Sequence, residues 1–338
     1  MMNLKHNGET ALVTGGAGFI GSCIAKELIK LEYQVIIIDD LSGGFISNIP
    51  KEAIFIEGSI VDVPFVQHIF QKFRIDYVFH LAAYAAEGLS HFIRRFNYEN
   101  NLIGSINLIN ESIKADIKCF VFTSSIAVYG EGQTPFSEDT IPNPEDPYGI
   151  SKLAVEMDLL NAYKMFGLNY IIFRPHNVYG ENQNIGDKYR NVIGIFMNRI
   201  MKKQSLPIFG DGSQTRAFSY ISDVAVPITR SIEMNGAYNQ IFNIGGDTPY
   251  SVKFLAELIK GKFKYNAQIE YLEARKEVLH AYSDHTKAKI FFGKYIKNVP
   301  IEEGISRMAK WAEGIGPMEP TKFKNIEIDK NLPSSWKE

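Results

Sequence analysis

The chain has 338 residues, a formal net charge of −2 and two cysteines. Domains typically have about 100 to 200 residues, so this length allows one large domain or two modest ones. Hydrophobic residues make up 45% of the chain and charged residues 22%, which supports a substantial core and argues against disorder. The near-neutral charge excludes a broad cationic surface of the kind that binds nucleic acids or membrane surfaces.

The cysteines and the apolar runs exclude further classes of protein. Cys23 and Cys119 cannot form a disulfide framework, and neither belongs to a Cys/His cluster typical of zinc sites. Met1–Thr10 carries no long apolar stretch, and no apolar run approaches the roughly 18 residues of a membrane span. We therefore expect a cytoplasmic protein that holds no metal and binds neither nucleic acid nor membrane.

Short apolar runs in the first half of the chain predict buried strands. They are Ala11–Thr14, Gln34–Asp39, Ala53–Glu57, Tyr77–His80, Cys119–Ser124 and Asn169–Arg174. Rich in Val, Ile and Phe and without alternation, they are typical of parallel strands covered on both faces. Apolar residues at helical spacing lie between them, from Ile20 to Leu31 and from Leu102 to Ile113. This alternation predicts an α/β fold with a Rossmann-type doubly wound parallel sheet.

The pattern changes after Tyr179, where glycine, asparagine and proline become frequent. Helical spacing is then isolated, at Val192–Met201, Val252–Lys260 and Ile301–Trp311. We expect a dinucleotide-binding domain over residues 1–180, with the chain crossing back to it near 210–245. Residues 181–313 would form mainly a smaller α/β substrate-binding portion. Residues 314–338 would form a tail that is extended on the surface or partly disordered.

A glycine-rich turn follows the first predicted strand and opens the first predicted helix. Thr14–Gly21 reads TGGAGFIG and places glycines at 15, 18 and 21. The first glycines permit a tight turn and a close approach of backbone N–H groups to a pyrophosphate, and the last permits close packing of the helix. The helix N-terminus adds partial positive charge. This segment predicts a dinucleotide-binding site.

An acidic residue ends the second predicted strand, 18 residues after Gly21. The carboxylate of Asp39 can accept hydrogen bonds from a ribose diol and repels a 2′-phosphate. Asp40 adds to that repulsion. The two carboxylates therefore predict NAD rather than NADP.

A serine, a tyrosine and a lysine form the candidate catalytic set. Ser125 follows the fifth predicted strand, and Tyr148 and Lys152 are four residues apart on one face of the next helix. A free phenol has a pKa of about 10 and is a poor base at neutral pH. A nearby ammonium, with the positive nicotinamide of NAD+, favours the phenolate. Such a tyrosine can act as an acid/base while a serine orients a substrate hydroxyl.

At these residues the chain closely resembles the extended short-chain dehydrogenase/reductase family, in the branch of sugar-nucleotide epimerases and dehydratases. The family landmarks occur in order: TGGAGFIG (14–21), HLAA (80–83), TSS-x-x-VYG (123–130), Y-x-x-x-K (148–152), RPHNVYG (174–180) and GDGSQTRAFSYISDV (210–224). The resemblance covers nearly all of residues 8–312. It implies a nucleotide-diphosphate sugar as substrate and a homodimer built from the helix with the 102–113 stripe and the helix that begins at Tyr148.

The resemblance also implies roles residue by residue. Ser125, Tyr148 and Lys152 match the catalytic set. The implied cofactor-binding residues are Gly15, Gly18, Phe19, Ile20, Gly21, Asp39, Asp40, Ser59, Ile60, Leu81, Ala82, Ala83, Asn101, Tyr148 and Lys152. The implied substrate-binding residues are Tyr84, Ser125, Asn177, Asn191, Arg216 and Arg275. Arg216 and Arg275 suit a pyrophosphate, because planar guanidinium groups form charge-assisted forks with it.

Departures from the family pattern narrow the expected reaction. Ile126 and Ala127 stand where related 3,5-epimerases carry a catalytic cysteine and 4,6-dehydratases carry an Asp-Glu pair, and neither residue can move a proton. What remains is epimerisation at C4 through a transient 4-keto sugar, with Tyr148 as the acid/base. The alternatives are a nucleotide-sugar dehydrogenase, reductase or dehydratase on the same scaffold, or a non-catalytic dinucleotide sensor. We expect a packing or hydrogen-bonding role for His176, which follows a predicted strand.

Overall fold

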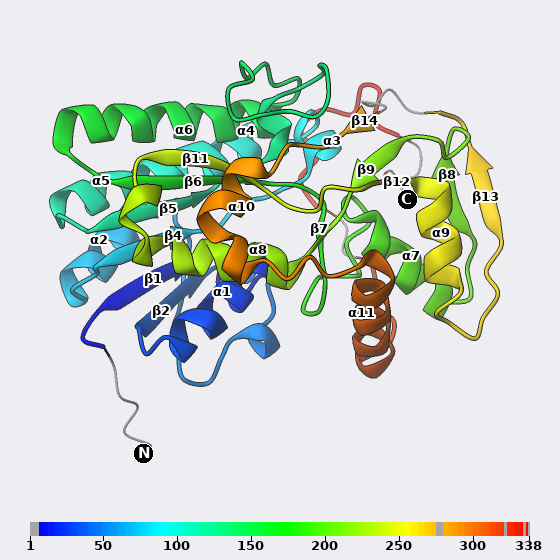
Figure 1. Cartoon of the computed structure of the whole chain (residues 1–338), viewed down its shortest axis with the longest axis horizontal. Helices are drawn as coiled ribbons and strands as arrows, with labels where there is room; N and C mark the ends of the chain where they lie inside the picture. Colours follow the sequence, from blue (N-terminus) through cyan, green and yellow to red (C-terminus); the bar gives the residue numbers. More distant parts are fainter. Residues whose placement is uncertain (1–6, 275–279, 321–322, 334–335, 337–338) are drawn as a thin grey trace.

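A seven-stranded parallel sheet forms the centre of the protein, in the order β11-β6-β5-β4-β1-β2-β3 (Figure 1). The computed structural model describes residues 7–274, 280–320, 323–333 and 336. The strands are β1 (Thr10–Thr14), β2 (Gln34–Asp39), β3 (Ile54–Glu57), β4 (Tyr77–His80), β5 (Cys119–Thr123), β6 (Tyr170–Pro175) and β11 (Gln240–Ile244). The order reverses at β1, as in a doubly wound sheet, which confirms the predicted Rossmann-type α/β class.

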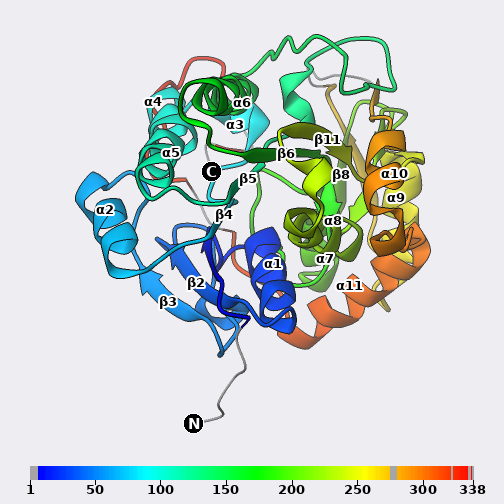
Figure 2. The ribbon, with the colours of Figure 1, turned by 60° about the vertical axis from the view of Figure 1, so that its left-hand side comes forward.

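Helices cover both faces of this sheet (Figure 2). One face carries α2 (Val63–Lys72), α5 (Gly104–Lys114) and α6 (Pro147–Phe166). The opposite face carries α1 (Phe19–Lys30) and α8 (Ile221–Arg230), which pack against each other. Both faces of the strands are therefore buried, as their unbroken apolar sequences predict.

Successive residues of one strand belong to two different cores. In β1, Ala11 and Val13 pack under α1 and α8, whereas Leu12 packs under α2, α5 and α6. β5 divides in the same way, with Val121 in the first core and Phe122 in the second. This follows from the two-residue period of side chains along a strand. A single strand thus joins the two helical layers.

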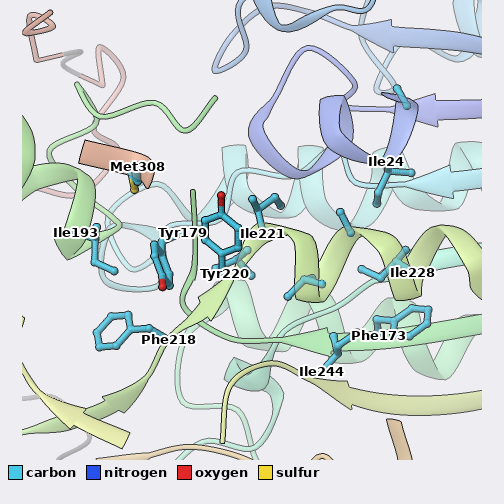
Figure 3. Close-up of a cluster of buried hydrophobic side chains, with 14 of the residues drawn as sticks. Ile24, Phe173, Tyr179, Ile193, Phe218, Tyr220, Ile221, Ile228, Ile244 and Met308 are labelled. Carbon is cyan, nitrogen blue, oxygen red and sulfur yellow. The ribbon is translucent and has the colours of Figure 1, made fainter. Parts of the chain in front are cut away.

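The first core continues into the part of the chain after β6 (Figure 3). Its members there come from α7 (Val192–Met201), α9 (Val252–Lys260), α10 (Thr286–Phe292) and α11 (Ile301–Ile315). Small sheets accompany these helices, built from β7 (Val178–Tyr179), β8 (Leu206–Phe209), β9 (Thr215–Ala217), β10 (Ser219–Tyr220), β12 (Pro249–Ser251), β13 (Ile269–Leu272) and β14 (His280–Ala281). Among the described residues, no helix is long and apolar enough to cross a lipid bilayer.

A buried ion pair fastens α6 to the central sheet. Arg174 of β6 donates to both carboxylate oxygens of Glu156, at 3.0 Å from Nε and 2.5 Å from Nη2. Both side chains are 3% exposed. Arg174 also donates to the Tyr129 hydroxyl at 2.8 Å, and the Ser124 hydroxyl donates to Glu156 at 2.5 Å. A buried pair of this kind holds its partners firmly only while both charges remain.

We expect Glu156→Gln to lower the free energy of unfolding by about 3–5 kcal/mol, because the buried guanidinium of Arg174 loses its counter-charge. Urea denaturation monitored by circular dichroism measures the change. Glu303→Gln is the matched control, since Glu303 pairs with Arg307 on the exposed face of α11. Exposed pairs contribute little, so equal losses in the two variants would contradict the assigned importance of the buried pair.

Candidate active site

A cleft of about 1280 Å³ opens at the carboxyl ends of the central strands. Its walls include the ends of β1, β2, β4, β5 and β6 and reach β9 and β14 in the later part of the chain. Carboxyl ends of neighbouring parallel strands meet at one edge of a sheet, and open α/β sheets bind their ligands there. The cleft is therefore the place where the predicted site residues can meet.

The glycine turn between β1 and α1 has no room for side chains. Gly15 has a φ of +67°, and a Cβ there would lie 2.7 Å from the backbone nitrogen of Ala82. A Cβ on Gly21 would lie 2.2 Å from the carbonyl oxygen of Gly15. Gly16, which is not among the predicted site residues, is equally constrained, because its Cβ would lie 2.6 Å from Cγ2 of Ile37. This tight, glycine-rich turn at a helix N-terminus fits a dinucleotide pyrophosphate.

Asp39 lies at the end of β2 and lines the cleft. Its carboxylate accepts the N–H of Ala17 at 3.0 Å and that of Leu41 at 2.8 Å. These bonds fix the orientation of the carboxylate and link it to the glycine turn. Burial raises the pKa of Asp39, although both backbone hydrogen bonds oppose the shift. A carboxylate held in this way has further lone pairs for the hydroxyls of a ribose.

Most of the predicted binding residues line this one cleft. They are Gly15, Gly18, Phe19, Ile20, Gly21, Asp39, Asp40, Ser59, Ile60, Leu81, Ala82, Ala83, Tyr84, Ser125, Tyr148, Lys152, Asn177, Asn191 and Arg216. Arg275 lies outside the described residues. The structure thus brings together residues from both halves of the chain.

Asn101 does not line the cleft, in contrast to its predicted contact with the dinucleotide. Its side chain accepts the N–H of Tyr84 at 2.7 Å and donates to the carbonyl of Tyr84 at 3.1 Å and to Asn97 at 2.7 Å. It therefore holds the backbone of a cleft residue. A π-helical turn over Glu99–Ile103 separates α4 (Arg94–Tyr98) from α5, and the neighbouring Asn100 lines the cleft instead.

The candidate catalytic residues meet where α6 begins beside the end of β5. Asp146 caps the helix by accepting the N–H of Gly149 at 2.9 Å, and Tyr148 lies in the first turn. Ser125 follows β5 and shares a hydrogen bond with the hydroxyl of Tyr148. Lys152 lies one turn further along, and its ammonium donates to the carbonyl of Thr123 at 2.8 Å. The nitrogen of Lys152 also stands 5.9 Å from the centre of the Tyr148 ring.

Burial shifts the pKa values of Tyr148 and Lys152 in opposite directions. It raises the pKa of Tyr148 above its ordinary value, against the hydrogen bond from Ser125 and the positive charge of Arg190. It lowers the pKa of Lys152 to about 7, against the attraction of Glu156. Burial thus favours the neutral form of Tyr148 and leaves Lys152 divided between its charged and neutral forms near pH 7. Ionisation of Tyr148 is favoured when further positive charge enters the site.

Arg190 is a cleft residue to which sequence reasoning assigned no role. Its guanidinium pairs with Asp187 at 2.5 Å and stands 5.0 Å from the centre of the Tyr84 ring. It is close enough to Tyr148 for each group to influence the pKa of the other. The only sequence signal is the spacing of Asp187 and Arg190, three residues apart, which is common on protein surfaces.

The C-terminal tail also reaches the cleft. Asn331, Pro333 and Trp336 line it, and the Trp336 ring packs edge to face against Phe92, with 6.0 Å between centroids, and against Tyr189, with 5.3 Å. The sequence predicts a tail that is extended on the surface or partly disordered, but it does not predict that the tail forms part of the cleft wall. Isolated aromatic residues in an aperiodic, proline-containing segment carry no signal for their partners.

Comparison with known proteins identifies the family of this chain. The model of the "NAD dependent epimerase/dehydratase family" matches residues 11–245. A Methanocaldococcus jannaschii protein, provisionally assigned as a UDP-glucose 4-epimerase, is 38% identical over 303 residues, which are 89% of this chain and 97% of that protein.

Solved structures of related proteins share the whole architecture. The UDP-glucose 4-epimerase of Thermotoga maritima with UDP-glucose is 37% identical, with a TM-score of 0.86, over 90% of this chain and 99% of that one. The UDP-glucose 4-epimerase of Thermus thermophilus in complex with NAD is 27% identical, with a TM-score of 0.84, over 89% of this chain and 98% of that one. The chain belongs to the NAD-dependent epimerase/dehydratase family, and NAD is its cofactor.

Proposed function

We propose that this enzyme interconverts UDP-sugars that differ in configuration at C4. One observation carries the proposal: Ser125, Tyr148 and Lys152 share the cleft, while the two residues after Ser125 that also line it, Ile126 and Ala127, cannot move a proton. A dehydratase needs additional acid/base groups to remove water, whereas C4 epimerisation needs one. The NAD-binding relatives with UDP-glucose 4-epimerase activity in their names support UDP as the nucleotide.

The residues of the cleft have distinct tasks in this reaction. Tyr148 accepts the proton of the C4 hydroxyl while Ser125 orients that hydroxyl. NAD, when bound by the glycine turn and Asp39, would supply the hydride acceptor and donor that oxidation and reduction at C4 require. Once the 4-keto sugar has rotated to present its opposite face, Tyr148 returns its proton to the oxygen on C4. Lys152 stabilises the ionised form of Tyr148, which is present before the phenolate accepts the proton and again after it returns it.

The diphosphate of the substrate has to stay in place while the sugar turns. We assign its binding to Arg216 with Asn177 and Asn191, which line the cleft on the later part of the chain. Arg275 remains a predicted second anchor. Gly15 to Gly21 and Asp39 would hold the NAD pyrophosphate and ribose, respectively. The proposed domain division matches these assignments. The cofactor residues lie within 1–180, and most of the residues that would bind the diphosphate lie within 181–313.

The proposed reaction is tested with a panel of UDP-, GDP-, CDP- and dTDP-sugars, with products identified by NMR. We expect interconversion of C4 epimers among the UDP-sugars without net formation of NADH. A stable keto-sugar product would favour a dehydratase instead. NAD-loaded protein that converts none of these sugars would overturn the proposal.

We expect Tyr148→Phe to lower kcat by about 10²- to 10⁴-fold, because the reaction loses its only direct acid/base while the ring keeps its packing. NMR conversion assays give kcat, and the absorbance of the purified protein reports retained NAD. Tyr271→Phe is the control, since Tyr271 is an exposed residue of β13 that does not line the cleft. Full activity of the Tyr148 variant would contradict the mechanism.

We expect the stability of the NAD-free protein to rise from pH 7 to pH 9 in a way that Lys152→Met abolishes. The pKa of Lys152 is about 7 in the folded protein and about 10.4 in an unfolded chain. The unfolded state therefore binds more protons in this range, and the free energy of unfolding gains up to about 1.4 kcal/mol per pH unit. Urea titrations at both pH values measure it, with Lys164→Met as an exposed control. If the free energy of unfolding changed with pH equally in the wild type and in Lys152→Met, the assignment of this pH dependence to Lys152 would be wrong.

We also propose that two copies associate through α5 and α6 and that the enzyme acts in the cytoplasm. α6 and the turn before α5 expose Ile103, Ile150, Met157, Tyr163, Met165 and Phe166, each between 41% and 68% accessible. Apolar side chains of this size commonly mark an interface when they gather on neighbouring helices. The free thiols of Cys23 and Cys119 support a reducing compartment.

We expect Met157→Asp to shift the protein from dimer to monomer, because a carboxylate would be buried at the centre of this interface. Analytical ultracentrifugation reports the mass. Ile290→Asp serves as the control, since Ile290 is 76% exposed on α10. A wild-type monomer, or a dimer that survives the Met157 change, would argue against this interface.

A further inference from the structure

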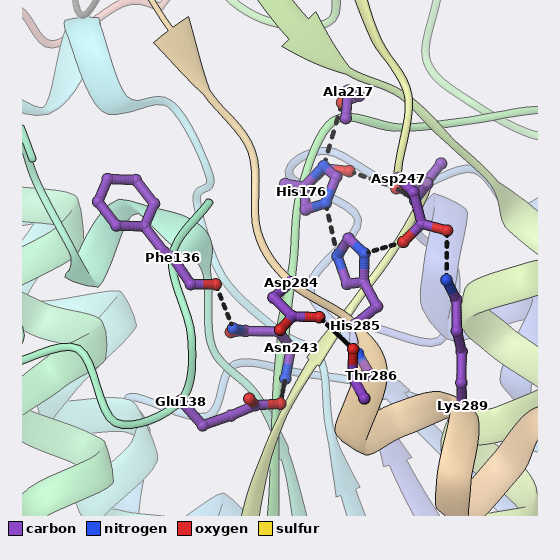
Figure 4. A network of polar contacts seen from close by, with 12 residues as sticks. Phe136, Glu138, His176, Ala217, Asn243, Asp247, Asp284, His285, Thr286 and Lys289 are labelled. Carbon is purple, nitrogen blue, oxygen red and sulfur yellow. Dashed lines mark hydrogen bonds and ion pairs between the residues drawn. The ribbon is translucent and has the colours of Figure 1, made fainter. Parts of the chain in front are cut away.

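Two buried histidines meet behind the cleft (Figure 4). His176 directly follows β6 and lines the cleft, and His285 directly precedes α10. Their Nε2 atoms are 2.9 Å apart, and the two side chains are 2% and 1% exposed, respectively. This contact joins segments that are distant in the sequence. Neither histidine has a part in the proton transfers proposed above.

The outer nitrogen of each ring faces a group that can only accept. Nδ1 of His176 lies 3.0 Å from the carbonyl oxygen of Ala217. Nδ1 of His285 lies 2.9 Å from a carboxylate oxygen of Asp247. The hydrogen bond from His285, with help from Lys289, lowers the pKa of Asp247 to about 2, so this group is an anion. Each Nδ1 must therefore carry a hydrogen.

These partners fix the number of protons on the pair. A neutral imidazole carries one N–H, so two neutral rings with hydrogens on Nδ1 would oppose bare lone pairs at 2.9 Å. A third ring hydrogen, placed between the two Nε2 atoms, converts this repulsion into a charge-assisted hydrogen bond. The pair thus holds one proton more than two neutral histidines.

The charged neighbours assign that proton to His285. Asp247 contacts this ring directly, and Asp284 is its neighbour in the chain. Lys289 balances the second oxygen of Asp247 at 2.5 Å, while Lys287 is engaged by the carbonyl of Ile241. On the other side, burial and the charge of His285 lower the pKa of His176 to about 3, which keeps that ring neutral. The nearest charges on β6, those of Arg174, are balanced by Glu156.

The far end of this chain of bonds reaches the substrate-anchoring residues. The carbonyl of Ala217 also accepts a hydrogen bond from Nδ2 of Asn177 at 3.0 Å. Asn177 has a φ of +41°, a left-handed conformation that needs support from its surroundings. Arg216 precedes Ala217 in β9, and both Asn177 and Arg216 line the cleft. The histidine pair is therefore connected through the Ala217 carbonyl to Asn177, and through the backbone of Ala217 to Arg216.

We propose that His285 and His176 are positioning residues of the diphosphate subsite, and that the proton shared between them holds Asn177 and Arg216 in the geometry that binds a nucleoside diphosphate. This inference rests on the proposed function. It assigns the pair to substrate binding and not to chemistry at C4. Loss of the shared proton would release the Ala217 carbonyl and weaken the anchor.

Two substitutions of His285 distinguish an effect of the shared proton on substrate binding from an effect of the side chain on packing. His285→Leu removes the donor to His176, and we expect KM for the UDP-sugar to rise about tenfold, with kcat and bound NAD unchanged. His285→Gln keeps an N–H donor that does not titrate. We expect its KM to stay near the wild-type value at neutral pH and to remain flat from about pH 6 to about pH 9, where KM of the wild type rises.

A direct measurement does not depend on any variant's folding. In the NAD-loaded wild type labelled with ¹⁵N-histidine, we expect one imidazolium and one Nδ1–H neutral ring among the buried histidines, coupled across a hydrogen bond. Calorimetry with UDP measures the Kd of the diphosphate subsite without any turnover of a sugar. Two neutral rings, or a wild-type KM that does not change with pH, would overturn the inference. Absence of both UDP binding and sugar conversion in the wild type would instead refute the proposed function.

Discussion

The contact between α6 and the ends of β5 and β6 is the interaction on which the rest of the site depends. Tyr148, Lys152 and Glu156 follow one another at four-residue spacing and so lie along one stripe of the helix. The last of them is bound to Arg174 and Ser124, and the middle one to the carbonyl of Thr123. The buried ion pair, with the apolar packing of Val155 and Leu159, therefore holds the helix against the sheet. The position of the Tyr148 hydroxyl beside Ser125 follows from that placement.

A few individually placed charges let an almost neutral chain handle anionic ligands. The cleft contains Lys152, Arg190 and Arg216, each placed by a specific partner or strand, rather than a broad basic surface. Asp39 and Asp40 supply the opposite charge where a ribose diol is expected. Burial makes each of these charges stronger at short range, because the surrounding protein screens less than water does. Few charges thus suffice.

The fold was predicted well from the sequence, and the predicted cofactor residues of the glycine turn and β2 were brought to one cleft, for physical reasons. Strands buried on both faces have unbroken apolar runs, and β2 and β4 begin and end where those runs do. The helices over Val192–Met201 and Val252–Lys260 have the predicted bounds because their apolar spacing is regular and bounded by polar residues. The glycine turn and Asp39 act through local chain geometry. Such features are visible in a short stretch of sequence.

The residues that escaped prediction act through distant partners. Asn101 lies in a π-helical turn and does not line the cleft, whereas Asn100 beside it does. His176 meets His285 across 109 residues, and the tail meets Phe92 and Tyr189 across a still longer span of chain. No periodicity connects such pairs. Only the tertiary structure shows that the partner exists.

The two halves of the proposed reaction rest on separate supports. The proton-transferring groups are fixed by α6 against β5 and β6, whereas the proposed diphosphate ligands are fixed by β9, the histidine pair and the start of α10. An epimerase has to let the sugar turn between two faces without moving either the base or the anchor. The two sets of supports meet at β6, which carries Arg174 and leads directly into His176 and Asn177. The proton held between His176 and His285 then bears on substrate binding and leaves the acid/base chemistry of Tyr148 to the helix that carries it.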